Sequence, residues 1–385
     1  MQKKSIIPGM SFLRMGHFSL CAAIAAAVCL AISCDRQDRY ISITGYAQGG
    51  TYMVKLNLRN ASGGVKLQPE AIKEGIDSVI AAVDTSLSGY NTESLLTRFN
   101  AGERIVPDSI FMDIYRMSYR FYEETGGAFD VASGPLFDIW GFGFREGSFP
   151  SAEEVARVKA ACGMDRLRPD IGNMTDADGT LALKDLLADD EVEGELPRLN
   201  YNAIAQGYTC DLVASYLYSI GVEDMLVDIG GEIYCDGLNP SGKPWTVGVD
   251  RPVDGNNVPG AMLEGTLSTD GGPCGIVTSG NYRKYYVKDG RKYAHTIDPR
   301  TGYPAADSLL SATVIARDAA TADALATYCM VIGFEKSKEF IRSRPDLRGY
   351  LIYARSDRQP FPAQVSGPEA GDSATADRFG TWLSD

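Results

Sequence analysis

The order of helical and strand-like segments constrains the fold of this chain more than any other feature. Apolar residues recur at helical spacing over residues 68–87 and again over 108–125. Short strand-like segments crowd residues 225–288, and a further strand at 311–316 precedes a helical segment at 320–332. Strict strand–helix–strand alternation is absent, which argues against doubly wound and barrel α/β folds. We therefore expect an α+β fold with mixed or antiparallel sheets and packed helices.

The first 34 residues have the features of a bacterial lipoprotein signal. Three basic residues precede an apolar run over residues 18–32, and small residues lead into Cys34. The run is short for a helix that spans a bilayer, so a cleaved signal is favoured over a transmembrane segment. We expect Cys34 to be lipidated, so that the protein is exported and anchored by lipid to a bacterial membrane. Secretion without a lipid is the alternative.

This signal sets the expected domain organisation. Residues 1–33 would be the signal peptide and residues 34–44 a tether. Residues 45–354 would form the folded domain. Residues 355–385 are rich in Pro, Ser, Asp and Gly and are expected to be a polar C-terminal tail.

Charge and histidine content exclude several classes of protein. The net charge of −13 disfavours sequence-independent nucleic-acid binding, which needs basic patches. Of two histidines, His17 lies in the signal, so the exported chain would keep only His295. Zinc fingers, HExxH metalloproteases and multi-histidine metal centres are thereby excluded. The five cysteines beyond the signal form no CxxC motif, and we expect buried thiols, with a disulfide as the alternative.

Two groups of residues match a phosphate-binding loop and a catalytic triad only in part. Residues 237–243 match GxxxxGK, but Pro244 stands where a phosphate-binding loop needs Ser or Thr, and a strand-like segment follows. We interpret them as a hairpin turn. Composition alone does not exclude a triad of Ser279, His295 and Asp298, although Ser279 lacks the GxSxG context.

Two other groups of residues can carry chemistry. His295 and Asp298 stand beside a Pro-x-x-Gly turn, a position that exposes side chains at a strand end. Asp323 and Thr327 are four residues apart on a predicted helix, so they share one face and offer a hard cation two oxygen ligands. The alternatives are a structural histidine, and a solvated Asp beside a Thr bonded to its own helix.

Together with other segments, these residues resemble the ApbE family of FAD:protein FMN transferases over about residues 45–335. The His-x-x-Asp-Pro-x-Thr-Gly-x-Pro piece at 295–304 and the Asp-x-x-x-Thr piece at 323–327 are the most specific. The other matching pieces, in the family's order, are residues 50–52, 87–100, 127–130, 140–143, 203–211, 230–232 and 278–280.

The resemblance implies an α+β fold that binds FAD in a groove, with Mg²⁺ at the diphosphate. The side chains of Asp323 and Thr327 and the carbonyls of Ala203 and Ala326 would be the metal ligands. His295 would be the general base, and Asp298 would orient it. The implied FAD contacts are Gly49, Tyr90, Ala128, Phe129, Asp130, Asn200, Gln206 and Ile297.

Two positions depart from the family pattern. Gly49 stands where the family commonly has Met, which removes a side-chain contact. Gln206 stands where Lys is common, which removes a positive charge near the diphosphate. FAD affinity is expected to suffer at both positions.

The resemblance also implies the reaction. A Thr or Ser hydroxyl of a target protein would attack the FMN-side phosphorus of FAD and release AMP. By analogy the targets would be subunits of membrane redox complexes, of the sodium-pumping NADH:quinone reductase or Rnf type. An FAD pyrophosphatase and a non-catalytic flavin-binding lipoprotein remain alternatives. Residues 307–313 and 369–375 are similar to the sequence around the Thr that the family modifies in its targets. Self-modification at Thr375 is therefore a hypothesis, whereas Thr313 is expected in a core strand.

Overall fold

The computed structural model describes residues 40–59, 68–143, 149–189, 195–253, 256, 258, 260–282, 285–288, 291–355 and 379–384. The predicted signal peptide, Cys34 and Thr375 lie outside these residues. Within them, no helix combines the length and the hydropathy needed to cross a bilayer.

An antiparallel sheet of eight strands forms the centre of the molecule, in the order β1-β2-β3-β4-β7-β12-β13-β14. Hairpins β5–β6, β8–β9 and β10–β11 form separate two-stranded sheets that are not hydrogen-bonded to it. The α+β prediction is confirmed. The strands are β1 Tyr40–Ala47, β2 Gly50–Asn57, β3 Met225–Ile229, β4 Glu232–Asp236, β5 Thr246–Asp250, β6 Leu263–Ser268, β7 Cys274–Gly280, β8 Tyr285–Lys288, β9 Arg291–Ala294, β10 Ile297–Asp298, β11 Tyr303–Pro304, β12 Leu309–Ala316, β13 Arg348–Ala354 and β14 Phe379–Leu383.

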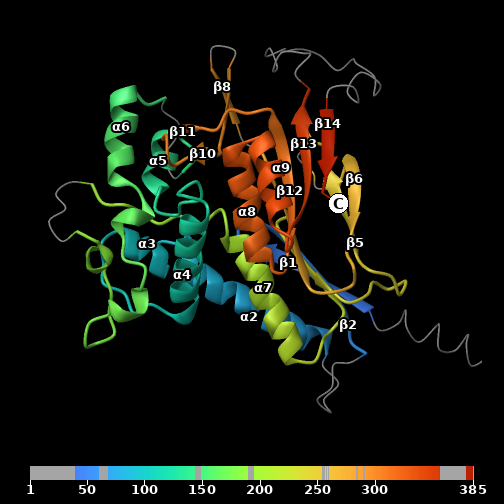
Figure 1. The fold of residues 1–385 in the computed structure, drawn as a ribbon. Helices are drawn as coiled ribbons and strands as arrows, with labels where there is room; N and C mark the ends of the chain where they lie inside the picture. Colours follow the sequence, from blue (N-terminus) through green and yellow to red (C-terminus); the bar gives the residue numbers. More distant parts are fainter. Residues whose placement is uncertain are drawn as a thin grey trace, which may run out of the picture.

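Helices cover one face of this sheet and extend beyond it (Figure 1). Helices α7 and α8 lie directly on the sheet, and α2 packs on α7. The helices are α2 Pro69–Leu87, α3 Leu95–Asn100, α4 Ser109–Glu124, α5 Gly134–Ile139, α6 Ala152–Ala161, α7 Ala205–Ser219, α8 Ala319–Ile332 and α9 Phe334–Ser343. Three short 3₁₀ turns lie between α6 and α7, at 164–166, 171–173 and 183–186.

Along each central strand, side chains point alternately into two cores, because successive side chains of a strand lie on opposite faces of the sheet. On β7, Val277 packs under the helices, whereas Ile276 faces the other core, which hairpin β5–β6 covers. On β12, Val314 and Ile315 divide in the same way. Burial on both faces explains why these strands are apolar almost throughout.

Helix ends follow their capping residues. The Asp108 carboxylate accepts a hydrogen bond from the Phe111 amide at 2.7 Å and starts α4. Asp318 does the same for α8 through the Thr321 amide at 2.7 Å. Helix α8 stops at Gly333, whose φ of 82° suits a residue without a Cβ.

The central sheet extends past both predicted ends of the folded domain, residues 45 and 354. Strand β1 begins at Tyr40, inside the expected tether, because it pairs with β2 along its whole length. Residues 379–383 of the expected tail form β14, which pairs with β13 and buries Phe379. A five-residue strand after a polar stretch is too short to show a periodic pattern, so only the pairing reveals it.

Two other predictions are confirmed. The GxxxxGK stretch is a turn, in which the Asn239 amide donates to the Lys243 carbonyl at 2.7 Å. The five described cysteines are all free, and four of them are buried.

Candidate functional site

Helices α7 and α8 are joined near their N-termini by a reciprocal pair of carboxylates. Asp323 of α8 accepts the Gly207 amide of α7 at 3.1 Å. Asp211 of α7 accepts the Ala319 and Ala320 amides of α8 at 2.8 and 2.9 Å. Amides at a helix N-terminus lack partners within the helix, so each carboxylate satisfies donors that the other helix exposes. The two helices lie side by side in Figure 1.

Gly207 makes this close approach of the helices possible. A Cβ at this position would lie 2.3 Å from the Ala319 carbonyl oxygen and 2.9 Å from the Asp323 Cβ. Any side chain would therefore push α8 away and lengthen the hydrogen bond to Asp323.

Asp323 and Thr327 form the predicted oxygen pair on α8. Asp323 is only 5% exposed, and burial raises the pKa of its carboxyl to about 7. The Thr327 hydroxyl lies 3.3 Å from the Ser279 hydroxyl of β7. A buried carboxylate with neighbouring hydroxyls is a donor set that suits a hard cation. No cluster of three or more His, Cys, Asp or Glu that could hold a metal occurs in the described ranges.

The predicted carbonyl ligands belong to the start of α7 and to α8. Ala203 comes just before α7, whose N-cap is Ile204, and Ala326 adjoins Thr327 on α8. Their assignment as ligands stays a prediction.

The end of β7 links this pair to the segment that carries His295. Ser279 contacts Thr327, and two residues later the Asn281 side chain accepts the Thr296 hydroxyl at 2.8 Å. His295 is half-buried, and its ring packs edge-on to Phe142, with the ring centroids 6.4 Å apart. The structure therefore brings the two most specific sequence pieces to one end of one strand.

Asp298 lies in the short hairpin β10–β11 and is paired with Arg300. The guanidinium donates to both carboxylate oxygens at 2.9 Å, and the Arg300 amide donates to one of them at 2.9 Å. The predicted orientation of His295 by Asp298 stays a prediction. Ile297, beside it, is buried in a small apolar core with Leu136 and Trp140, so its side chain is not exposed to a ligand.

The two turns that carry Gly49 and Gly230 both meet α7, the helix that carries Gln206. The Gln48 side-chain amide at the β1–β2 turn donates to the Thr209 hydroxyl of α7 at 2.7 Å. Gly230, at the β3–β4 turn, has a φ of 70°, and a Cβ there would lie 2.2 Å from the Gln206 amide nitrogen. A pocket of about 460 Å³ opens at the β1–β2 turn and includes Gly49 among its lining residues.

The segment with Ala128, Phe129 and Asp130 runs beside Asn200. The Asn200 amide donates to the Val131 carbonyl at 2.7 Å. The Asp130 carboxylate accepts the Ala132 and Met164 amides at 2.8 and 3.4 Å. Burial raises the pKa of Asp130 to about 7.

The side chains of this segment differ in what they offer a ligand. Ala128 and the Phe129 ring are buried, and the ring stacks edge-on with Phe121 at 5.8 Å. Tyr90 lies on the loop between α2 and α3 and is 75% exposed. The Phe129 ring is therefore hidden from a ligand, whereas most of Tyr90 is exposed to solvent.

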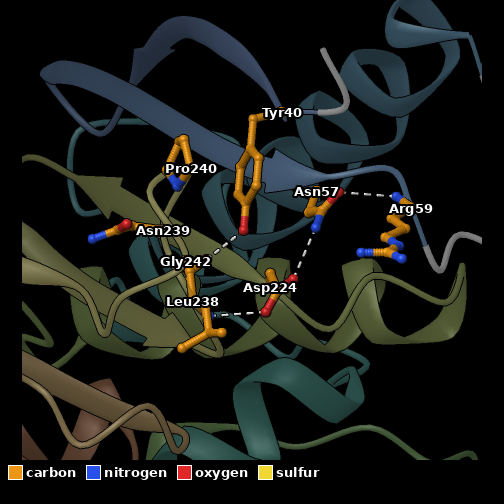
Figure 2. A pocket seen from close by; sticks show the side chains of 8 residues that line it. All are labelled: Tyr40, Asn57, Arg59, Asp224, Leu238, Asn239, Pro240 and Gly242. Atoms are coloured by element: carbon orange, nitrogen blue, oxygen red, sulfur yellow. Dashed lines mark hydrogen bonds between the residues drawn. The ribbon is translucent and has the colours of Figure 1, made fainter. Parts of the chain in front are cut away.

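A second cavity, of about 280 Å³, contains none of the predicted site residues (Figure 2). Polar groups in its wall bond to one another: the Tyr40 hydroxyl donates to the Leu238 carbonyl at 2.6 Å. The Asp224 carboxylate accepts the Asn57 amide at 2.9 Å and the Leu238 backbone amide at 2.8 Å. These bonds hold the start of β1 against the loop after β4, which is a structural role.

Several residues of this site escape sequence reasoning. Asp211 belongs to a recognised segment, but its bonds to α8 depend on tertiary packing. Ser279 and Asn281 connect the two chemical groups through hydroxyl and amide contacts that have no sequence signal. Phe142 could be recognised only as part of residues 140–143, one of the segments that resemble the family.

Comparisons with known proteins agree on one family. The sequence model of the ApbE family matches residues 48–351. An FAD:protein FMN transferase of Haemophilus influenzae is 32% identical over 336 residues, which cover 86% of this chain and 91% of the relative. One of Escherichia coli K12 is 35% identical over 293 residues, which cover 74% and 78%.

Solved structures give the same result. The flavin transferase ApbE from Vibrio cholerae superposes with a TM-score of 0.66 at 28% identity, covering 90% of this chain and 97% of that one. The apo flavinyl transferase ApbE of Pseudomonas stutzeri gives 0.67 at 30% identity, covering 82% and 92%.

Proposed function

Because this chain belongs to the ApbE family, whose relatives are named FAD:protein FMN transferases, we propose a specific form of flavin transfer for it. FMN moves from FAD to a Thr or Ser hydroxyl of a target protein, and AMP is released with the aid of Mg²⁺. One observation carries the proposal: the end of β7 contacts both the Asp323–Thr327 helix and the His295 segment. A base and a candidate metal site on one scaffold suit phosphoryl transfer.

Asp323 and Thr327 would hold Mg²⁺ with the carbonyls of Ala203 and Ala326. The fit is supported by the burial of the Asp323 carboxylate and by the Thr327 hydroxyl, which lies one helical turn further along α8 and contacts Ser279, since a cation would stabilise the charged form of a buried carboxylate. When bound, Mg²⁺ would offset negative charge on the diphosphate of FAD. The contribution of this chain is to fix the oxygens, since Gly207 and Ser279 each contact one of the two side chains.

His295 would take the proton from the attacking hydroxyl. The oxygen of that hydroxyl forms a bond to the FMN-side phosphorus, and the bond from this phosphorus to the bridging oxygen breaks, so AMP departs. An imidazole titrates near neutral pH, which suits a base that acts on a hydroxyl. Phe142 limits the rotation of the His295 ring by packing against it.

Some of the remaining predicted contacts lie near one another in the structure. Gly49 is on a turn that meets α7, the helix that carries Gln206. Residues 128–130 lead into Val131, whose carbonyl accepts the Asn200 amide. The residues proposed to bind FAD are Gly49, Tyr90, Ala128, Phe129, Asp130, Asn200, Gln206 and Ile297.

The test is mass spectrometry of a target peptide that carries a Thr acceptor, incubated with the full chain, FAD and Mg²⁺. An FMN adduct with the wild type and none with His295→Ala or Asp323→Asn supports the proposal. Asp318→Asn is the matched acidic control, because it changes a carboxylate of α8 that only caps that helix. FMN and AMP without an adduct would indicate a pyrophosphatase, and bound FAD without turnover a flavin carrier.

The export signal adds a proposal about location. We propose that Cys34 carries a lipid, which would hold the enzyme at a bacterial membrane near target subunits of redox complexes. Labelling of the wild type but not of Cys34→Ala with a radioactive fatty acid in cells supports this. Equal labelling of both would contradict it.

A further inference from the structure

Two buried cysteines face each other across neighbouring central strands. Cys235 near the end of β4 is the direct register partner of Cys274 at the start of β7. Their sulfur atoms are 3.7 Å apart, and the side chains are 0% and 8% exposed. In the described part of the chain, this is the one pair of cysteines in sulfur–sulfur contact.

We propose that Cys235 and Cys274 are a modification site, at which a small disulfide such as oxidised glutathione closes a cross-strand disulfide bond. Direct partners in an antiparallel pair have Cα atoms about 4.5–5.5 Å apart. Disulfides need about 4.4–6.8 Å between Cα atoms, so the strands need not separate or slide. A small rotation of the side chains would bring the two sulfur atoms within bonding distance.

The chemistry is a two-step thiol–disulfide exchange. The Cys274 thiolate attacks one sulfur of the small disulfide, which forms a mixed disulfide and releases one thiolate. Cys235 then loses its proton and attacks the Cys274 sulfur, which forms the protein disulfide and releases the second thiolate. The two protein thiols lose two electrons and two protons, and the small disulfide is reduced to two thiols.

The environment assigns an order to these steps. Cys274 is the more exposed of the two, so the small disulfide reaches it first. The contact between the two thiols lowers the pKa of Cys274, which agrees with Cys274 as the attacking thiolate. Cys235 has no access to solvent but already contacts Cys274, so it can resolve the mixed disulfide without opening of the sheet.

The cross-link would lie away from the candidate catalytic groups. Cys274 starts β7, whereas Ser279, which contacts Thr327, stands near its other end. Closure would tie together the two ends of residues 235–274, a long loop that includes hairpin β5–β6. Constraining a loop of this length in the unfolded chain should raise the Tm by roughly 5–10 °C.

The experiment treats the purified full chain with oxidised glutathione, alkylates the remaining thiols under denaturing conditions and maps the peptides by mass spectrometry. We expect the peptides of Cys235 and Cys274 to be joined and to have lost two hydrogen atoms. Treatment should also raise the Tm of the wild type and of Cys329→Ser, which lacks an unrelated buried thiol. The Tm of Cys235→Ala should not rise.

Two results would overturn the proposal, and both come from the wild type, so they do not depend on whether a variant folds. In the first, both cysteines are alkylated after treatment. In the second, glutathione stays attached to Cys274, which would mean that Cys235 cannot reach the mixed disulfide. The proposal does not rest on flavin transfer, so neither result bears on the proposed activity.

Discussion

Replacing Asp211 with Ala tests whether the contact between α7 and α8 builds the candidate metal site. The change removes the acceptor of two hydrogen bonds, from the Ala319 and Ala320 amides. It leaves Asp323 and its own bond to Gly207 in place. Any loss of metal affinity would therefore reflect the position of α8, not the loss of a ligand.

The structure sets the size of the effect on stability. Each buried amide left without an acceptor costs about 1–3 kcal/mol, so the loss of two acceptor bonds in Asp211→Ala should lower the free energy of unfolding by about 2–6 kcal/mol. Asp318→Ala is the matched control, because Asp318 caps the same helix through the Thr321 amide but does not reach α7. Loss of an N-cap costs about 1 kcal/mol.

The assay combines urea unfolding with titration of Mn²⁺, followed by electron paramagnetic resonance. We expect Asp211→Ala to weaken cation binding by about tenfold or more, which corresponds to about 1.4 kcal/mol. Asp318→Ala should bind Mn²⁺ within about twofold of the wild type. Asp211→Asn should recover part of both losses, because the amide oxygen still accepts one bond. If the two Ala variants weakened Mn²⁺ binding equally, the role assigned to Asp211 would be refuted.

Three further changes test other parts of the structure. Gly207→Ala should destabilise the protein by about 1–3 kcal/mol or more, since the new Cβ meets the Ala319 carbonyl, and urea unfolding with an unchanged midpoint would contradict this. Burial raises the pKa of Asp130 from its ordinary value of 3.8 to about 7 in the folded protein, so its contribution to stability is lost as pH rises from about 4 to 7. The Tm of Asp130→Asn should fall less than that of the wild type between pH 5 and 8, and parallel curves would reject the assignment. Phe379→Ala should cost about 3–5 kcal/mol in thermal unfolding, because the ring is buried between strands, whereas a mobile tail would give no change.

Much of the fold could be predicted from local patterns. Helix α2 matches its apolar spacing, and the ends of α4 and α8 match their Asp caps. The strand at the C-terminal end could not be predicted, because β14 is defined by the partner that it pairs with. Pairing between residues far apart in the chain leaves little trace in a short segment.

The candidate site shows the same division. The residue types of His295, Asp323 and Thr327 and their spacing indicated the chemistry, and the family matches confirm the family that they predicted. The role of Asp298 toward His295 stays a prediction, and the structure adds that the Asp298 carboxylate binds Arg300.

By itself, the sequence determined the α+β class, the family and the chemical character of the candidate site. These follow from patterns within short segments: helical spacing, capping residues and a few polar side chains at fixed intervals. Only the tertiary structure decided which segments meet. The bonds of Asp211 to α8, the contact of Ser279 with Thr327 and the facing thiols of Cys235 and Cys274 all join residues far apart in the chain. Such contacts form because burying apolar faces on the sheet fixes the helices and strands in register, which no local pattern encodes.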